Sequence, residues 1–203
     1  MEHLAAQIIA FIRDNPGWSL AVIGITAFGE SFAFLSLLFP GTTILIAAGG
    51  LISTGALSFG STVAAGIVGA VLGDAISFWL GEKFGPLLPR LWPFRTNPGL
   101  LERGVDFFGR YGGASVFIGR FFGPLRAVVP LAAGMMHMPA VRFYIANILS
   151  ALVWAPALVI SGALIARSLA RSGNIEATIF YLAVAAAFVI GLAYWARRRF
   201  GVR

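Results

Sequence analysis

Two arginines lie in a stretch that is otherwise almost wholly apolar, "FIGRFFGPLRAVVPLAAG", which covers residues 117–134. A guanidinium group is always charged, and its planar fork of N–H donors suits a phosphate. Gly123 and Pro124 interrupt the stretch between the two arginines. The backbone N–H groups freed there, together with the start of the following helix, would also favour an anion. We therefore expect Arg120 and Arg126 to bind an anionic, phosphate-bearing group.

Two acidic residues, Glu30 and Asp74, lie in other apolar segments of the chain. A charged side chain at the centre of a membrane helix costs about 2.5–3.5 kcal/mol, so four uncompensated charges would cost on the order of 10 kcal/mol. Pairing with Arg120 and Arg126 would offset most of that cost. A carboxylate can also take up a proton, which makes both acids candidates for proton coupling or charge balancing. The alternative is a structural role, in which the pairs only hold helices together.

The composition indicates a membrane protein. The chain of 203 residues is 59% hydrophobic and 11% charged, whereas a soluble domain carries about 25% charged residues. Its apolar segments are continuous, not alternating, which predicts an all-α polytopic fold and excludes a membrane β-barrel. The net charge of +7 is expected at the cytoplasmic membrane surface, with no nucleic acid as partner. Because the chain has no cysteine and its two histidines, His3 and His137, are far apart, we expect no metal site and no cofactor.

The apolar segments and their breaks predict one membrane domain over residues 18–196, preceded by a short interfacial helix within residues 1–17. The predicted parts of the domain are a first repeat over 18–81, a cytoplasmic loop over 82–110, a second repeat over 111–166 and a last span over 179–196, followed by a basic tail over 197–203. Each repeat should contain a broken apolar segment and then a full span, with the breaks near residues 39–41 and 123–124 and the spans over 57–80 and 141–166.

The two repeats share a weak sequence pattern, because "PGTTILIAAG" (40–49) and "PLRAVVPLAAG" (124–134) both run from a proline to Ala-Ala-Gly. Basic residues number five in the loop and four in the tail, against two near residues 167–171, which places the loop and the tail in the cytoplasm. The chain returns to that side only if the second broken segment does not cross. We therefore expect two inverted re-entrant helical hairpins packed with three full transmembrane spans, an arrangement typical of secondary transporters.

Several small or polar residues are candidates for supporting the site. Asn147 is polar at mid-membrane depth and should form a hydrogen bond between helices, and Trp154 shares its helix face. Gly73 is a further candidate. It belongs to a face of the first full span that carries small residues every four positions, which lets another backbone approach closely; they are Gly69, Gly73, Ser77 and Gly81. The other supporting candidates flank the two breaks and are Pro40, Gly41, Thr42 and Pro124.

These residues together resemble the DedA family of membrane proteins, also described as the SNARE-associated or VTT-domain superfamily. The resemblance covers residues 18–196, and its matching pieces are Glu30 ahead of "FPGTTILIAAG", then "GDAISFWLGEKFG", "GRFFGPLRAVVPLAAGMMHM" and "FYIANILSALVW". The chain departs from the family at two positions. Thr42 stands where members often carry an acid directly after the first Pro-Gly, and Ser150 replaces the glycine of the family's Asn-x-x-Gly.

The resemblance implies two oppositely facing re-entrant hairpins and a role in moving lipids between membrane leaflets. Bacterial members are implicated in returning undecaprenyl phosphate, the carrier lipid of envelope synthesis, and in physiology that depends on the proton motive force. The family's functional acids and arginines map onto Glu30, Asp74, Arg120 and Arg126. The expected protein is a multi-pass protein of a bacterial inner membrane with a cytoplasmic C-terminus. Its expected partners are a polyprenyl phosphate or an anionic phospholipid and the surrounding membrane lipids.

Two other function classes stay open at this point. One is a proton- or cation-coupled transporter of small solutes, in which the acids bind the cation and the arginines only pair with them. The other is a membrane assembly factor that transports nothing. A homo-oligomer is also left open. An enzyme is not expected, because the chain lacks cysteine and a Gly-x-Ser-x-Gly motif, and its apolar segments hold no histidine.

Overall fold

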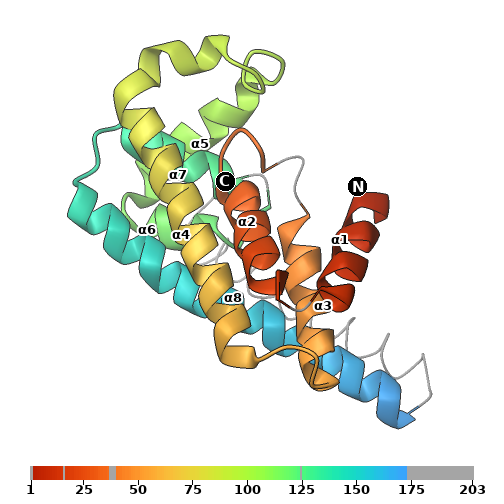
Figure 1. The fold of residues 1–203 in the computed structure, drawn as a ribbon. Coiled ribbons are helices and arrows are strands. Elements are labelled where there is room, and N and C mark those ends of the chain that lie inside the picture. Colours follow the sequence, from red (N-terminus) through yellow and green to blue (C-terminus); the bar gives the residue numbers. More distant parts are fainter. Residues whose placement is uncertain (1, 16, 37–39, 124, 173–203) are drawn as a thin grey trace.

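The computed structural model describes residues 2–15, 17–36, 40–123 and 125–172, and these ranges form the helical bundle of Figure 1. In chain order its elements are α1 (Glu2–Asp14), α2 (Ser19–Ser31), α3 (Gly41–Ser53), α4 (Phe59–Phe84), the 3-10 helix η1 (Gly85–Arg90), α5 (Pro98–Tyr111), α6 (Ala114–Gly119), α7 (Leu125–Met135) and α8 (Ala140–Ser172). The predicted all-helical class is confirmed over these ranges. The predicted last span over 179–196, the basic tail over 197–203 and Pro124 lie outside the described residues.

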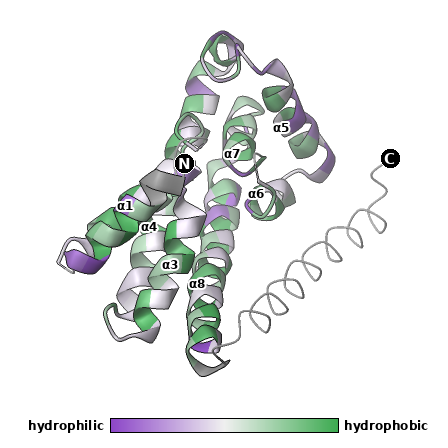
Figure 2. Ribbon diagram, turned by 90° about the vertical axis from the view of Figure 1, so that its right-hand side faces the viewer, coloured by the Kyte–Doolittle hydropathy of each residue, from purple (hydrophilic) through white to green (hydrophobic). Residues whose placement is uncertain are grey.

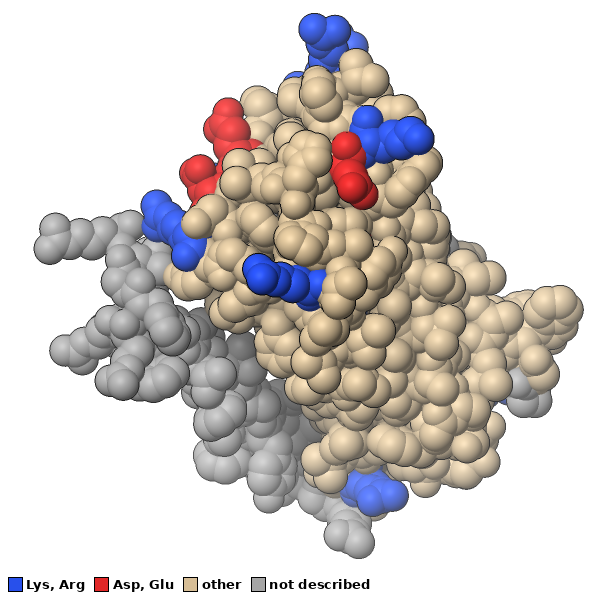
Figure 3. All heavy atoms as spheres, turned by 90° about the vertical axis from the view of Figure 1, so that its left-hand side faces the viewer, with Lys and Arg blue, Asp and Glu red and all other residues tan. Residues whose placement is uncertain are grey.

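Two of the described helices, α4 and α8, are long and apolar enough to cross a membrane. α4 has 26 residues and α8 has 33. At a rise of about 1.5 Å per residue, each is longer than the hydrocarbon core of about 30 Å. Hydrophobic residues dominate both helices (Figure 2). On the face in Figure 3, most charged side chains lie in the upper half, and a broad uncharged surface separates them from a basic side chain at the lower end. The spans predicted over 57–80 and 141–166 are therefore confirmed as membrane-length helices.

Each long helix follows a pair of short helices separated by a break, α2 and α3 before α4, and α6 and α7 before α8. The first break begins earlier than expected, because it is predicted near residues 39–41 and α2 already ends at Ser31. Phe32 leaves the helix with an extended backbone (φ −80°, ψ 122°), and the N–H of Ala33 donates to Ser77 Oγ on α4 at 3.0 Å. A long-range hydrogen bond thus replaces the helical pattern that the apolar composition favours.

The two broken pairs open toward opposite ends of the molecule. In Figure 1, α3 connects to α4 at the lower end, α4 runs to the upper end, and α7 connects there to α8, which runs back down. This is the relation that inverted repeats require. The re-entrant, three-span arrangement in a membrane stays a prediction.

Close backbone contact through glycine joins the first broken pair to the second long helix. Gly49 lies on α3, and a Cβ at this position would run into the carbonyl group of Val159 on α8. Gly162 on α8 faces back, and a Cβ there would run into the carbonyl group of Ile46 on α3. Because only glycine leaves room for this approach, the pair fixes where α3 crosses α8.

The matching contact joins the second broken pair to the first long helix. A Cβ on Gly134 of α7 would run into the carbonyl group of Phe78 on α4, and one on Gly81 of α4 would run into that of Leu131 on α7. Gly49 and Gly134 end the two Ala-Ala-Gly runs of the predicted repeat. The two repeats are therefore packed into each other, since α3 of the first lies on α8 of the second and α7 of the second lies on α4 of the first.

The predicted small-residue face of α4 makes close backbone contacts with two helices, α2 and α7. Gly69 and Gly73 face α2, because a Cβ on the first would run into the carbonyl group of Gly24 and one on the second would lie 2.6 Å from that of Phe28. Gly81, further along the same face, contacts α7. The close helix approach predicted from the spacing of these residues is confirmed.

The segment predicted as a cytoplasmic loop over 82–110 is more helical than expected, since it holds the end of α4, then η1, and most of α5. The amphipathic helix predicted within it is α5, which buries Leu101 and Phe108 and leaves Glu102 and Arg103 exposed. At the other end of the chain, the helix predicted before residue 17 is α1, and its Ile12 packs into the main apolar core. The interfacial position of α1 stays a prediction.

Gly49→Ala is expected to lower the thermal unfolding temperature of the detergent-purified protein, because overpacking against Val159 costs about 1–3 kcal/mol. Gly50→Ala is the matched control on the same helix, since its Cβ would lie 3.7 Å from Ala166 Cβ, an ordinary contact. The control should leave the unfolding temperature unchanged or raise it, because alanine favours a helix over glycine by up to about 1 kcal/mol. Equal shifts in the two variants would contradict the close α3–α8 contact.

Candidate anion-binding site

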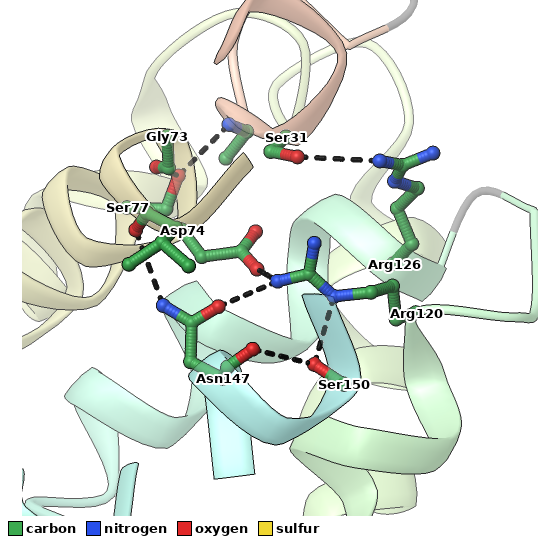
Figure 4. Close-up of polar contacts among 10 residues, drawn as sticks. Ser31, Gly73, Asp74, Ser77, Arg120, Arg126, Asn147 and Ser150 are labelled. Atoms are coloured by element: carbon green, nitrogen blue, oxygen red, sulfur yellow. Dashed lines mark hydrogen bonds and ion pairs between the residues drawn. The ribbon is translucent and has the colours of Figure 1, made fainter. Parts of the chain in front are cut away.

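Four charged side chains from separate segments meet in the interior of the molecule, and Figure 4 shows three of them. Glu30 lies at the end of α2, Asp74 on α4, Arg120 directly after α6, and Arg126 in the first turn of α7. Asp74 and Arg120 are each 4% exposed and Arg126 is 8% exposed. The four residues selected from the sequence therefore form one buried cluster, and each arginine pairs with one acid.

The first pair joins Arg120 to Asp74 and is fixed by both long helices. Arg120 Nη2 donates to the Asp74 carboxylate and to Asn147 Oδ1 (2.5 Å), and Nε donates to Ser150 Oγ (2.8 Å). Asn147 in turn donates through Nδ2 to the carbonyl group of Val71 on α4 at 3.1 Å, which is the hydrogen bond between helices that the sequence predicts. Arg120 is thus held by partners on α4 and on α8.

The second ion pair joins Arg126, in the first turn of α7, to Glu30, at the end of α2. Arg126 Nη1 donates to Glu30 Oε1 at 2.5 Å, and Nη2 donates to Ser31 Oγ at 3.2 Å. Thr42, at the start of α3, donates its hydroxyl group to the same Glu30 oxygen and lies 3.5 Å from Arg126 Nη1. The second pair therefore connects the beginning of α7 to the break between α2 and α3.

Trp154 on α8 lies beside both guanidinium groups. Its ring centroid is 4.3 Å from Arg126 Cζ and 5.8 Å from Arg120 Cζ, distances at which a cation is attracted to the ring face. The same side chain is 4% exposed and packs in the main apolar core. Trp154 therefore combines core packing with a contact to the charged cluster.

The cluster has no net charge, and two of its polar atoms lack a partner. Two carboxylates face two guanidinium groups, which is how a low-dielectric interior accommodates four charges. Among the described residues, Arg120 Nη1 and Glu30 Oε2 are buried and make no hydrogen bond. A buried polar atom without a partner is costly. One free donor and one free acceptor thus mark where a further group could bind.

The VTT domain family matches residues 39–164, which is more than half of the chain. The chain belongs to the VTT-domain family. Inner membrane protein YabI of Escherichia coli K12 is 35% identical over 194 residues, covering 95% of this chain and 76% of YabI. Protein DedA of the same strain is 28% identical over 157 residues, covering 75% of this chain and 71% of DedA.

An uncharacterized membrane protein of Synechocystis is also similar, with 38% identity over 134 residues, 65% of this chain and 62% of that protein. No solved structure matches the chain significantly. The protein is thus a DedA-family membrane protein, and its similarity to YabI supports an inner-membrane location. The cytoplasmic side of its C-terminus stays a prediction.

Two glycines of the VTT-domain protein leave room for the charged cluster. A Cβ on Gly41 would run into the carboxylate of Glu30, and a Cβ on Gly73 would lie 2.9 Å from Ser31 Cβ. Pro40 precedes Gly41 at the N-cap of α3, and its carbonyl group accepts the first helical hydrogen bond from Ile44 at 3.1 Å. Gly41 and Gly73 therefore support the site by leaving space for the ion pair between α2 and α7.

The sequence did not identify the serines that complete the site as site residues, and Ser77 was expected only as part of the small-residue face of α4. Ser31 accepts a hydrogen bond from Arg126, and Ser150 accepts one from Arg120. Ser77 Oγ accepts a hydrogen bond from the N–H of Ala33, just after α2. Ser31 directly follows Glu30 in an apolar segment, and that adjacency is the signal that could have selected it. Ser150 was noted only as a departure from the family, although its position one helical turn after Asn147 places it on the same face.

Asp74→Asn is expected to lower the thermal unfolding temperature strongly, because it leaves the buried Arg120 without its counter-charge. Breaking a buried ion pair costs about 3–5 kcal/mol, whereas replacing both partners with apolar side chains is often neutral. The double variant Asp74→Leu with Arg120→Met should therefore recover most of the loss. Glu102→Gln, an exposed change on α5, is the control. If Asp74→Asn and Glu102→Gln unfold at the same temperature, the buried pair does not stabilise the fold.

Proposed function

We propose that this VTT-domain protein is a membrane lipid transporter that moves a phosphate-bearing lipid between the two leaflets. The observation that carries the proposal is the buried cluster of two arginines and two acids beside the breaks of the two helix pairs. The arginines would bind the headgroup, and the acids would balance its charge and carry protons. The resemblance to the DedA family makes undecaprenyl phosphate the first candidate for the lipid.

Exposed apolar side chains directly beside the cluster support a lipid as the transported molecule. Phe121 and Phe122 directly follow Arg120 and are 45% and 39% exposed. An acyl or polyprenyl chain could thus remain in the bilayer against these side chains while a headgroup reaches the arginines.

Charge balance supports coupling to protons. The cluster is neutral before a substrate arrives, and a phosphate headgroup would bring at least one negative charge into a low-dielectric interior, which is costly. A proton taken up by Glu30 or Asp74 would restore neutrality. A carboxylate beside an arginine can therefore couple the movement of an anionic lipid to the movement of protons.

One observation favours a second candidate function, a membrane assembly factor that transports nothing. Both arginines are paired with acids, so the cluster satisfies most of its own charge without a substrate. In that case the ion pairs would only join the two repeats. The transport measurement below separates this function from lipid transport.

Arg126→Ala is expected to slow the movement of a fluorescent or radiolabelled polyprenyl phosphate across reconstituted vesicles by at least about tenfold, because a charge-assisted hydrogen bond is worth about 1.5–3 kcal/mol. Arg103→Ala removes an exposed arginine on α5 and is the matched control, expected to keep the wild-type rate. Transport by Arg126→Ala at the wild-type rate would refute the headgroup role. No transport by the wild-type protein would favour the assembly factor.

Glu30→Gln is expected to remove the dependence of transport on a pH gradient. In the wild-type protein, collapsing the gradient with a protonophore should slow lipid movement, because a titratable carboxylate carries the compensating proton. The glutamine variant keeps a hydrogen-bonding side chain of similar size but cannot exchange a proton. If its residual transport still responds to the protonophore as the wild-type protein does, proton coupling does not pass through Glu30.

A further inference from the structure

The two ion pairs of the cluster differ in how firmly each arginine is held. Arg120 makes hydrogen bonds of 2.5 Å and 2.8 Å to neutral partners on α8, in addition to its contact with Asp74. The neutral partners of Arg126 are further away, Ser31 at 3.2 Å and Thr42 at 3.5 Å. Without its acid, Arg120 would still be fixed by two short hydrogen bonds, whereas Arg126 would keep two longer hydrogen bonds and its contact with the Trp154 ring.

The acids differ in the same direction. The Arg120 and Asp74 side chains are 3% and 6% exposed, while those of Arg126 and Glu30 are 8% and 12% exposed. Glu30 occupies the next-to-last position of α2, and its Oε1 receives both of its hydrogen bonds while Oε2 is buried without a partner. Each arginine engages a single carboxylate oxygen of its acid. The two acids therefore differ in their exposure and in the buried, unpaired Oε2 of Glu30.

We propose that an anionic headgroup displaces Glu30 from Arg126 and leaves the Asp74–Arg120 pair closed. This inference rests on the proposed function and assigns different roles to the two arginines that the sequence treats alike. Arg126 is the residue that changes its partner. Its guanidinium group binds the Glu30 carboxylate when no lipid is bound and binds the headgroup when a lipid is present. Arg120 and Asp74 form the fixed side of the site.

The free corner of Arg120 completes the binding position. Arg120 Nη1 is buried and makes no hydrogen bond within the described residues. In Figure 4 this corner of the guanidinium group points away from Asn147 and Ser150, toward the side of the cluster where Ser31 and Arg126 lie. A phosphate that takes the place of the Glu30 carboxylate could accept from Arg126 and from Arg120 Nη1 at once, without breaking any bond of Arg120.

The test measures binding of farnesyl phosphate, a short polyprenyl phosphate, to the full-length protein in detergent, with farnesol as the uncharged probe. Glu30→Gln should bind farnesyl phosphate about tenfold more tightly than the wild-type protein, because its internal competitor has lost its charge. Asp74→Asn should also tighten binding less, by a factor at least about fivefold smaller than the factor for Glu30→Gln. Ser150→Ala, a milder change at the fixed side, replaces Asp74→Asn if that variant does not fold. Glu102→Gln controls for the loss of one negative charge from the chain.

The outcomes separate the inference from the proposed function. If the wild-type protein prefers farnesyl phosphate over farnesol but Glu30→Gln binds no more tightly, the displacement of Glu30 is refuted and the lipid function stands. Tightening by Asp74→Asn equal to that by Glu30→Gln would refute the unequal roles of the two pairs. If no variant distinguishes farnesyl phosphate from farnesol, the headgroup is not recognised, and both the proposed function and this inference fail.

Discussion

A guanidinium group in an apolar interior needs a counter-charge within reach, and most of this fold can be understood from that requirement. Arg120 and Arg126 lie in the second repeat, while Asp74 and Glu30 lie in the first. Neither repeat buries its own charges, because within the described part of the chain the two arginines of one repeat pair with the two acids of the other. The two halves must therefore assemble into one unit, since separation would leave four uncompensated charges at membrane depth.

The glycine contacts make that assembly possible. α3 crosses α8 through Gly49 and Gly162, and α7 crosses α4 through Gly81 and Gly134, so each repeat supports the other at backbone distance. Helix pairs in a membrane gain little from the hydrophobic effect and depend on such close packing. Because these crossings bring the two breaks to the same depth, the residues at the breaks can contact one another. Packing and charge pairing thus depend on each other.

The sequence predicted what is local and could not predict what is long-range. The charged residues were visible because they interrupt apolar runs, and the small face of α4 because its glycines recur every four positions. The pairing was not, since nothing in the spacing says that Glu30 faces Arg126 and not Arg120. The end of α2 at Ser31 was missed for the same reason, because a hydrogen bond from Ala33 to Ser77, 44 positions away, decides it. The apolar composition alone favours a longer helix.

The residue at position 42 decides which charge the cluster can accept. Proteins that this chain resembles often carry an acid directly after the first Pro-Gly, and such an acid would leave the buried cluster with one negative charge in excess. Thr42 contributes only a hydroxyl group, which donates to Glu30, so two acids balance two arginines. A cluster without excess negative charge has no carboxylate to spare for a metal or sodium ion. Under the proposed function, the cluster takes up an anion once a proton neutralises one acid, and this asymmetry is the reason for proposing an anionic headgroup rather than a cation as its ligand.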